Sequence, residues 1–80
     1  MTENTVTIYT TPTCGWCGAV KEHLKANNVT FEEVNVAADM NRAREMVEKS
    51  GQYGVPVVDI NGEIVVGFDR ARIDALLGLS

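Results

Sequence analysis

The spacing of hydrophobic residues predicts seven short elements along the chain. Strands are indicated where β-branched and aromatic residues alternate with polar ones or run together, which they do in residues 6–9, 31–36, 55–60 and 63–66. Helical spacing is found in residues 18–26 and in the segments that follow Asp39 and Asp69. The apolar positions of the last two helices are Met40, Ala43 and Val47 in one and Ile73, Leu76 and Leu77 in the other.

Turn and capping residues separate these elements. Pro12 interrupts the chain after the first strand. Asp39 and Asp69 are typical N-cap residues, and Gly51 is typical of the position that follows a helix. Asn61-Gly62 is a strong signal for a two-residue hairpin between the third and fourth strands. The predicted order is therefore β-α-β-α-β-β-α.

This order predicts an α/β fold. The first crossover is long enough to join two parallel strands in the right-handed sense, whereas the hairpin adds two strands that are antiparallel to each other. Three amphipathic helices can cover such a sheet. We expect a four-stranded mixed sheet flanked by three helices, in a single domain over residues 1–80.

Composition narrows the classes of partner. The chain has 80 residues, 45% of them apolar, and a net charge of −4. The absence of a Lys/Arg cluster argues against nucleic acids and anionic membranes. No apolar run approaches the roughly 18 residues of a membrane span, and residues 1–4 lack the apolar region of a signal peptide. We expect a cytoplasmic monomer with no nucleic-acid or membrane partner.

Both cysteines lie in Cys14-Gly15-Trp16-Cys17, where a strand gives way to a helix. This spacing at such a junction is typical of thiol-disulfide redox sites. In the first turn of a helix, positions i and i+3 share a face with Cβ atoms about 5–6 Å apart, not far from the roughly 3.5–4.5 Å of a disulfide. The helix N-terminus favours a thiolate on the first cysteine. We expect Cys14 to be the nucleophile and Cys17 the resolving thiol.

Three other roles for the cysteines are less favoured. A structural disulfide over this short loop would remove little entropy from the unfolded chain. A zinc site usually needs four protein ligands, whereas the chain offers two cysteines and His23, which lies on a different helical face from Cys17. Two merely buried cysteines fit poorly with glycine and tryptophan between them. We expect redox chemistry and no metal site.

Three segments form a family pattern: residues 9–17 (YTTPTCGWC), 54–57 (GVPV) and 66–69 (VGFD). In this order and at these separations they resemble the glutaredoxins, small members of the thioredoxin superfamily, over residues 6–77. The resemblance implies a thioredoxin-like (glutaredoxin) fold, catalysis by Cys14 and Cys17, and a cis Val55–Pro56 bond that faces the cysteine pair. It also implies a substrate-binding surface that comprises Thr11, Trp16, Val55, Pro56, Gly67, Phe68 and Asp69.

The chain departs from the usual glutaredoxin pattern at two positions. Thr11 stands where a lysine usually holds the glycine carboxylate of glutathione, and Arg70 stands where an aspartate would meet the γ-glutamyl ammonium. Each change weakens glutathione anchoring by about 0.5–1.5 kcal/mol. Gly67-Phe68 instead resembles the hydrogen donors of ribonucleotide reductase, which take electrons from thioredoxin reductase.

We therefore expect disulfide-containing protein substrates, no tightly bound cofactor, and thioredoxin reductase as the preferred reductant, with glutathione possible as a co-substrate. Three other functions stay open at this point. The first is a glutathione-linked enzyme that removes glutathione from proteins with Cys14 alone. Two protomers would bridge a [2Fe–2S] cluster through Cys14 and glutathione in an iron–sulfur carrier. The third possibility is a binding module without redox turnover.

Six further residues have simpler expected roles. Tyr9 and Tyr53 either flank the site or belong to the core and its rim. His23 is expected to be solvated on the helix surface. Arg42, Arg44 and Arg70 are expected to form charged helix faces.

Overall fold

A computed structural model describes residues 5–79 of the chain. Its elements follow the predicted order and are β1 (Val6–Thr10), α1 (Gly15–Ala26), β2 (Glu32–Asn35), α2 (Met40–Ser50), β3 (Val57–Ile60), β4 (Glu63–Val66) and α3 (Arg70–Leu77). Residues 1–4, on which the expectation of no signal peptide rests, lie outside the described residues. The assignment of residues 1–80 to one domain stays a prediction.

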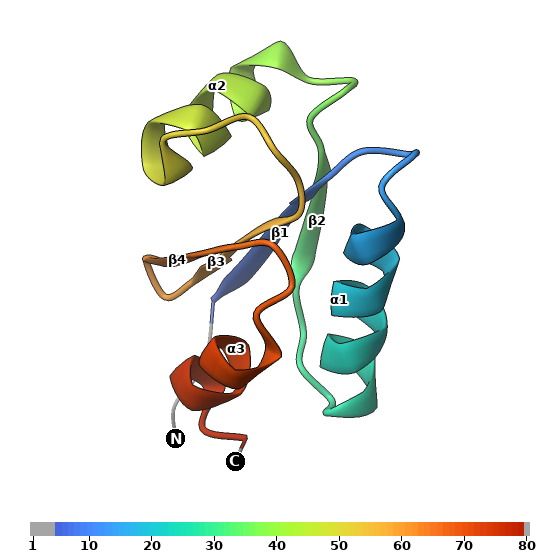
Figure 1. Cartoon of the computed structure of the whole chain (residues 1–80), viewed down its shortest axis with the longest axis vertical. Helices are drawn as coiled ribbons and strands as arrows, with labels where there is room; N and C mark the ends of the chain where they lie inside the picture. Colours follow the sequence, from blue (N-terminus) through green and yellow to red (C-terminus); the bar gives the residue numbers. More distant parts are fainter. Residues whose placement is uncertain (1–4, 80) are drawn as a thin grey trace.

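The strands form one mixed sheet in the order β2-β1-β3-β4. β1 is parallel to β2 and antiparallel to β3, which is antiparallel to β4. Asn61-Gly62 makes the β3–β4 turn, with both residues at positive φ, as this dipeptide predicts. The mixed four-stranded sheet and its three helices (Figure 1) confirm the thioredoxin-like fold.

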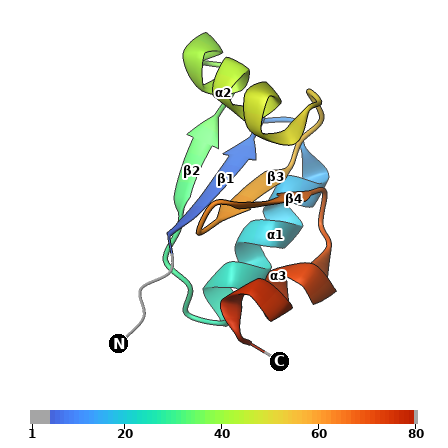
Figure 2. The ribbon, with the colours of Figure 1, turned by 90° about the vertical axis from the view of Figure 1, so that its left-hand side faces the viewer.

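Hydrophobic side chains fill both faces of the sheet. Ile8 and Val58 lie in a cluster with residues of α1 and α3, whereas Tyr9 and Val57 lie in a second cluster with Met46 of α2. Alternation along β1 and β3 sends neighbouring residues to opposite faces. Two views show α2 and α3 at opposite ends of the molecule (Figures 1 and 2). With α1 and α3 on one face of the sheet and α2 on the other, residues 5–79 form a three-layered α/β structure.

Capping residues lie at the helix termini where the sequence predicts them. Asp39 accepts hydrogen bonds from the N–H groups of Asn41 and Arg42, and Asp69 accepts one from Arg72. Gly51 follows α2 in the left-handed conformation. The bounds of β1 and β2 differ from the prediction by one residue, and two other boundaries differ by more. α1 begins at Gly15 rather than at residue 18, and β3 begins at Val57 rather than at residue 55, after a proline that lacks a ladder donor.

The buried face of α2 also differs from the prediction. Met40 is 81% exposed, because it opens the helix, while Met46 is the buried residue of α2. Val47 packs against the same cluster as Met46, as predicted, and polar side chains lie beside these two residues. The buried Tyr9 donates its hydroxyl hydrogen bond to Glu45 and accepts one from Lys49 Nζ at 3.0 Å. Tyr9 is therefore a core residue that docks α2.

These contacts shift the pKa values of the groups involved. The hydrogen bond from Tyr9 lowers the pKa of the Glu45 carboxyl below its ordinary value of 4.5. Burial raises the pKa of Tyr9. The hydrogen bond to Asp59, at 2.7 Å, raises the pKa of Lys49. The network therefore ties α2 to β1 and β3 through charged side chains.

We expect Tyr9→Phe to lower the free energy of unfolding at neutral pH by about 1–2 kcal/mol, the range for a hydrogen bond to a charged group beside other partners. The folded-state pKa of Glu45 lies below 4.5, so its stabilisation is complete above that pH and is lost as the pH falls through the folded value. The variant should therefore lose stability less steeply on acidification. Urea unfolding at a series of pH values measures both effects.

Tyr53→Phe is the matched control, because Tyr53 is 80% exposed. It should leave both the stability and its acid dependence unchanged. The alternative result is a free energy of unfolding for Tyr9→Phe that falls in parallel with that of the unmodified protein as the pH is lowered from 7. That result would contradict the assignment of the Glu45 pKa shift to this hydroxyl.

Candidate active site

The two cysteines are joined in a disulfide at the N-terminus of α1. Cys14 is the N-cap residue, and its sulfur accepts a hydrogen bond from the N–H of Cys17 at 3.1 Å. The Cα atoms are 5.4 Å apart. Cys17 is 2% exposed and Cys14 is half-buried. An attacking sulfur can therefore reach Cys14 more easily than Cys17.

The turn after β1 places Cys14 at the start of the helix. The N–H of Cys14 donates to the carbonyl oxygen of Thr11 at 3.2 Å. The first turn of α1 carries no acidic residue. A thiolate at this position would meet the positive end of the helix dipole without an opposing carboxylate in that turn.

Three segments adjoin the same end of the sheet. Tyr9 lies opposite Val57, and Val57 lies opposite Val66. The segment after β1, the segment before β3 and the segment after β4 are therefore neighbours. They carry Cys14, the Val55–Pro56 pair and Gly67-Phe68, respectively.

The Val55–Pro56 peptide bond is cis, which confirms the isomer implied by the family resemblance. Pro56 is buried, and its carbonyl oxygen accepts a hydrogen bond from the N–H of Gly67 at 2.8 Å. This bond joins the segment before β3 to the segment after β4. The structure thereby brings together two of the three sequence segments that form the family pattern.

An aromatic pair joins the third segment to them. Trp16 is 66% exposed, and its ring centroid lies 6.2 Å from that of Phe68. The disulfide therefore lies beside an exposed aromatic surface. Asp69, next in the chain, uses its carboxylate to cap α3, so this candidate binding residue already has a structural partner.

The expectation for His23 is wrong. Its side chain is 11% exposed, and its Nε2 atom lies 2.6 Å from Oδ1 of Asp74 on α3. Its ring also contacts Phe68, at a centroid distance of 5.9 Å. Arg70 is exposed, with its Nε atom 3.9 Å from Asp74. No local signal in the sequence links His23 to Asp74, because the two residues meet only when α1 and α3 pack.

The expected arginine faces are only partly solvated. Arg44 is exposed, whereas Arg42 is half-buried and bonds Glu45 through Nε at 3.3 Å. Arg42 also lies 3.5 Å from Glu32 of β2. Arg42 therefore helps to dock α2 on the sheet.

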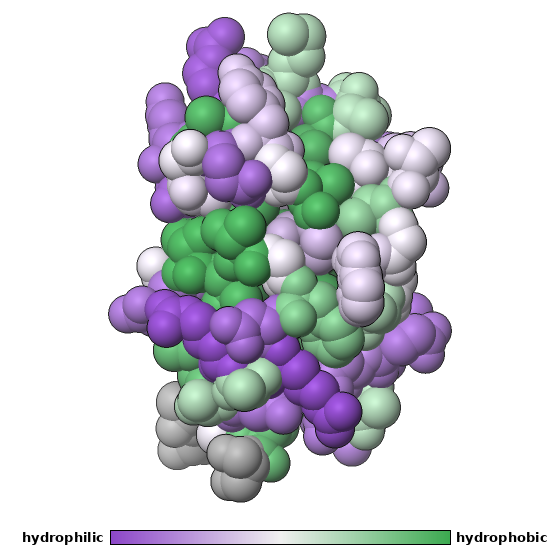
Figure 3. Space-filling model, viewed as in Figure 1, coloured by the Kyte–Doolittle hydropathy of each residue, from purple (hydrophilic) through white to green (hydrophobic). Residues whose placement is uncertain are grey.

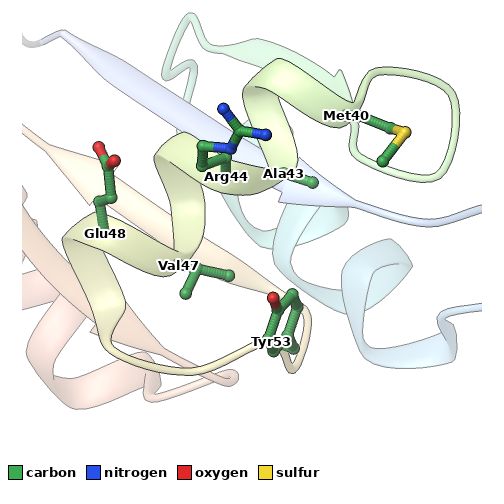
Figure 4. Close-up of a pocket in the computed structure, with 6 residues that line it drawn as sticks. All are labelled: Met40, Ala43, Arg44, Val47, Glu48 and Tyr53. Carbon is green, nitrogen blue, oxygen red and sulfur yellow. The ribbon is translucent and has the colours of Figure 1, made fainter.

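A shallow groove of about 220 Å³ lies along α2. Figure 4 shows Tyr53 on the loop that follows α2, with the other lining residues on the helix. Tyr53 and Met40 are among the most exposed hydrophobic side chains of the described residues. Tyr53 therefore lies at the rim of this groove and not in the core. Figure 3 shows further hydrophobic surface over β4, where Val66 is 52% exposed.

Residues 5–79 contain no cluster of three or more histidine, cysteine, aspartate or glutamate side chains that could hold a metal ion. Within the same range, no helix is both long enough and apolar enough to cross a membrane.

Comparisons with known proteins agree with this geometry. The family model described as Glutaredoxin matches residues 6–65. A glutaredoxin-like 8.6 kDa protein in the rubredoxin operon of Clostridium pasteurianum is 53% identical over 72 residues, which cover 90% of this chain and 96% of the relative. Glutaredoxin 3 of Escherichia coli is 33% identical over 75 residues, covering 92% and 90%. The solved thioredoxin-like protein BC3987 superimposes with a TM-score of 0.84 at 38% identity, covering 89% and 97%. The chain belongs to the glutaredoxin family.

Proposed function

We propose that this protein is a dithiol-disulfide oxidoreductase that reduces protein disulfides through a reversible Cys14–Cys17 disulfide. One observation supports the proposal above the others. The more accessible sulfur, that of Cys14, sits at a helix N-terminus and is bonded to a buried partner, Cys17. Helix N-termini lower the pKa of cysteine thiols, and an accessible thiolate with an adjacent second thiol is what the reaction needs.

In the proposed reaction, the Cys14 thiolate attacks one sulfur of the substrate disulfide. The substrate S–S bond breaks, the second substrate sulfur leaves as a thiolate that takes up a proton, and Cys14 is left in a mixed disulfide. Cys17 then loses its proton and attacks the Cys14 sulfur, which releases the first substrate sulfur. Two electrons have passed from the dithiol to the substrate, and an external thiol or dithiol reductant restores Cys14 and Cys17.

The surface around the disulfide supports recognition of an extended protein segment. Val55 and Pro56 lie ahead of β3, where backbone groups of Val55 can pair with a visiting strand. Trp16, Gly67 and Phe68 offer an apolar wall beside Cys14. We assign Thr11 and Asp69 to the margin of this surface, and Asp69 contributes mainly through the fixed start of α3.

The choice of reductant follows from charge. Glutaredoxins use glutathione, whose carboxylates and ammonium need opposite charges at their binding site. Thr11 is uncharged and Arg70 is an exposed cation, so this chain offers weak anchoring for both ends of glutathione. We therefore propose thioredoxin reductase as the preferred electron donor.

A comparison of two reductants tests this function. The oxidised protein is offered to thioredoxin reductase in one assay and to glutathione with glutathione reductase in the other, and NADPH consumption is followed with insulin as the disulfide substrate. We expect turnover mainly with thioredoxin reductase. Turnover mainly with glutathione would instead favour the glutathione-linked activity. Failure with both, although dithiothreitol reduces Cys14–Cys17, would argue against the proposed function.

A further inference from the structure

We propose that His23 is a positioning residue, whose imidazole ring holds Phe68 and Trp16 in the orientation that binds protein substrates. This inference rests on the proposed function. It follows from a continuous row of contacts that starts on α3 and ends between the two cysteines. In order, the row comprises Asp74, His23, Phe68 and Trp16.

The first part of the row fixes the imidazole. His23 Nε2 lies 2.6 Å from Asp74 Oδ1, and the two side chains are 11% and 21% exposed. Asp74 in turn has Arg70 at 3.9 Å on α3. A hydrogen bond to a carboxylate is shorter and stronger than one between neutral groups. The imidazole therefore has a fixed place between α1 and α3.

The second part of the row connects the His23 ring to the proposed substrate-binding surface. The His23 and Phe68 ring centroids are 5.9 Å apart with a 58° angle between the planes, and those of Phe68 and Trp16 are 6.2 Å apart with a 45° angle. These separations are within the range of attractive aromatic pairs. One side of Phe68 packs against the hydrophobic core, and its ring lies between that of His23 and the exposed ring of Trp16. We expect loss of the His23 ring to let Phe68 change rotamer.

The consequence concerns binding more than chemistry. The sulfur atoms that react are held by the start of α1 and by their own hydrogen bond, whereas Trp16 and Phe68 form the wall that an apolar side chain of a protein substrate would cover. Displacement of that wall should raise the KM for a protein disulfide. It should leave the maximal rate, and the reaction with a small aliphatic disulfide, nearly unchanged.

Two substitutions separate this role from a simple link between helices. His23→Gln retains a hydrogen-bond donor for Asp74 but removes the ring, whereas His23→Phe retains a ring but removes the donor. We expect His23→Gln to raise the KM for insulin about three- to tenfold, in the range that one aromatic contact supports. His23→Phe should keep a KM within about twofold of the unmodified protein, because a ring at this mostly buried position is also held by packing between α1 and α3.

The assay uses the pre-reduced full chain in single-turnover reactions with insulin and with 2-hydroxyethyl disulfide, so no reductase is needed. The half-saturating substrate concentration and the limiting rate constant of these reactions stand for KM and the maximal rate. Thermal unfolding confirms that each variant is folded. Trp16 is the single tryptophan of the chain, so the tryptophan bands of near-ultraviolet circular dichroism report on its contact with Phe68. These bands should weaken in His23→Gln and persist in His23→Phe.

The opposite pattern would overturn the proposal: a normal KM and normal tryptophan bands in His23→Gln, with losses in His23→Phe, would assign to His23 only the bond between α1 and α3. The Phe68→Leu background gives a second test. His23→Gln should raise the KM no further there, because the ring that His23 positions is absent, and additive effects would also overturn the proposal. If the unmodified protein fails to reduce insulin, the proposed function fails, while the tryptophan bands still test the contact itself.

Discussion

Cys14→Ser should abolish disulfide reduction, because it removes the sulfur that caps α1 and leaves only the buried Cys17. Serine preserves the shape of the N-cap and its ability to accept the N–H of residue 17. The loss should therefore be chemical and not structural. Insulin reduction with dithiothreitol as electron donor measures the activity, and thermal unfolding of the reduced proteins checks the fold.

Cys17→Ser is the matched variant, and it should show a different defect. Cys14 can still attack a substrate disulfide, but the mixed disulfide has no resolving thiol and accumulates. Mass spectrometry after incubation with an excess of a disulfide substrate should find the adduct on Cys14. An adduct that forms on Cys17 in Cys14→Ser as readily as on Cys14 in Cys17→Ser would reverse the assignment of the two roles.

Thr11→Lys combined with Arg70→Asp should improve glutathione-dependent turnover several-fold, up to about tenfold. The lysine supplies a cation for the glycine carboxylate, and the aspartate supplies an anion for the γ-glutamyl ammonium. A gain of about 1.4 kcal/mol corresponds to tenfold. The change should cost little stability, because Arg70 is exposed and its 3.9 Å ion pair with Asp74 is of a kind that contributes little.

Thr11→Met with Arg70→Asn is the control, since it reproduces much of the side-chain size without the new charges. It should leave turnover with glutathione low. The KM for glutathione, measured with glutathione reductase and NADPH, should fall only in the charged double variant. If both double variants behave alike, neither position faces the ligand; if the unmodified protein is already efficient with glutathione, weak anchoring is the wrong explanation.

Local signals in the sequence were enough to predict the order of the elements and much of the site. Asp39 and Asp69 cap the starts of their helices and Gly51 caps the end of α2, all through contacts with near neighbours. Their roles can therefore be inferred from a few adjacent residues. The Cys14–Cys17 spacing is similarly local. The family resemblance, and not the periodicity, supplied the cis Val55–Pro56 bond.

Local signals do not predict polar contacts between segments that are distant in the sequence. The bond between His23 and Asp74 spans 51 positions, and the one between Tyr9 and Glu45 spans 36. Hydrophobic spacing treats a histidine or a glutamate as an outward-facing residue, so it does not predict the burial of His23 or the polar contacts that α2 makes with β1 and β3. In both cases tertiary packing decides where the side chain lies.

The two borders of the sheet differ in how well they resist a second chain. β2, on one border, has exposed Glu32, Glu33 and Asn35 and a single buried residue. Charged side chains on a short edge strand discourage edge-to-edge aggregation. β4, on the other border, ends in Val66, which is 52% exposed. β4 therefore has the weaker protection of the two against intermolecular strand pairing, and we expect Val66→Lys to strengthen it without altering either cysteine.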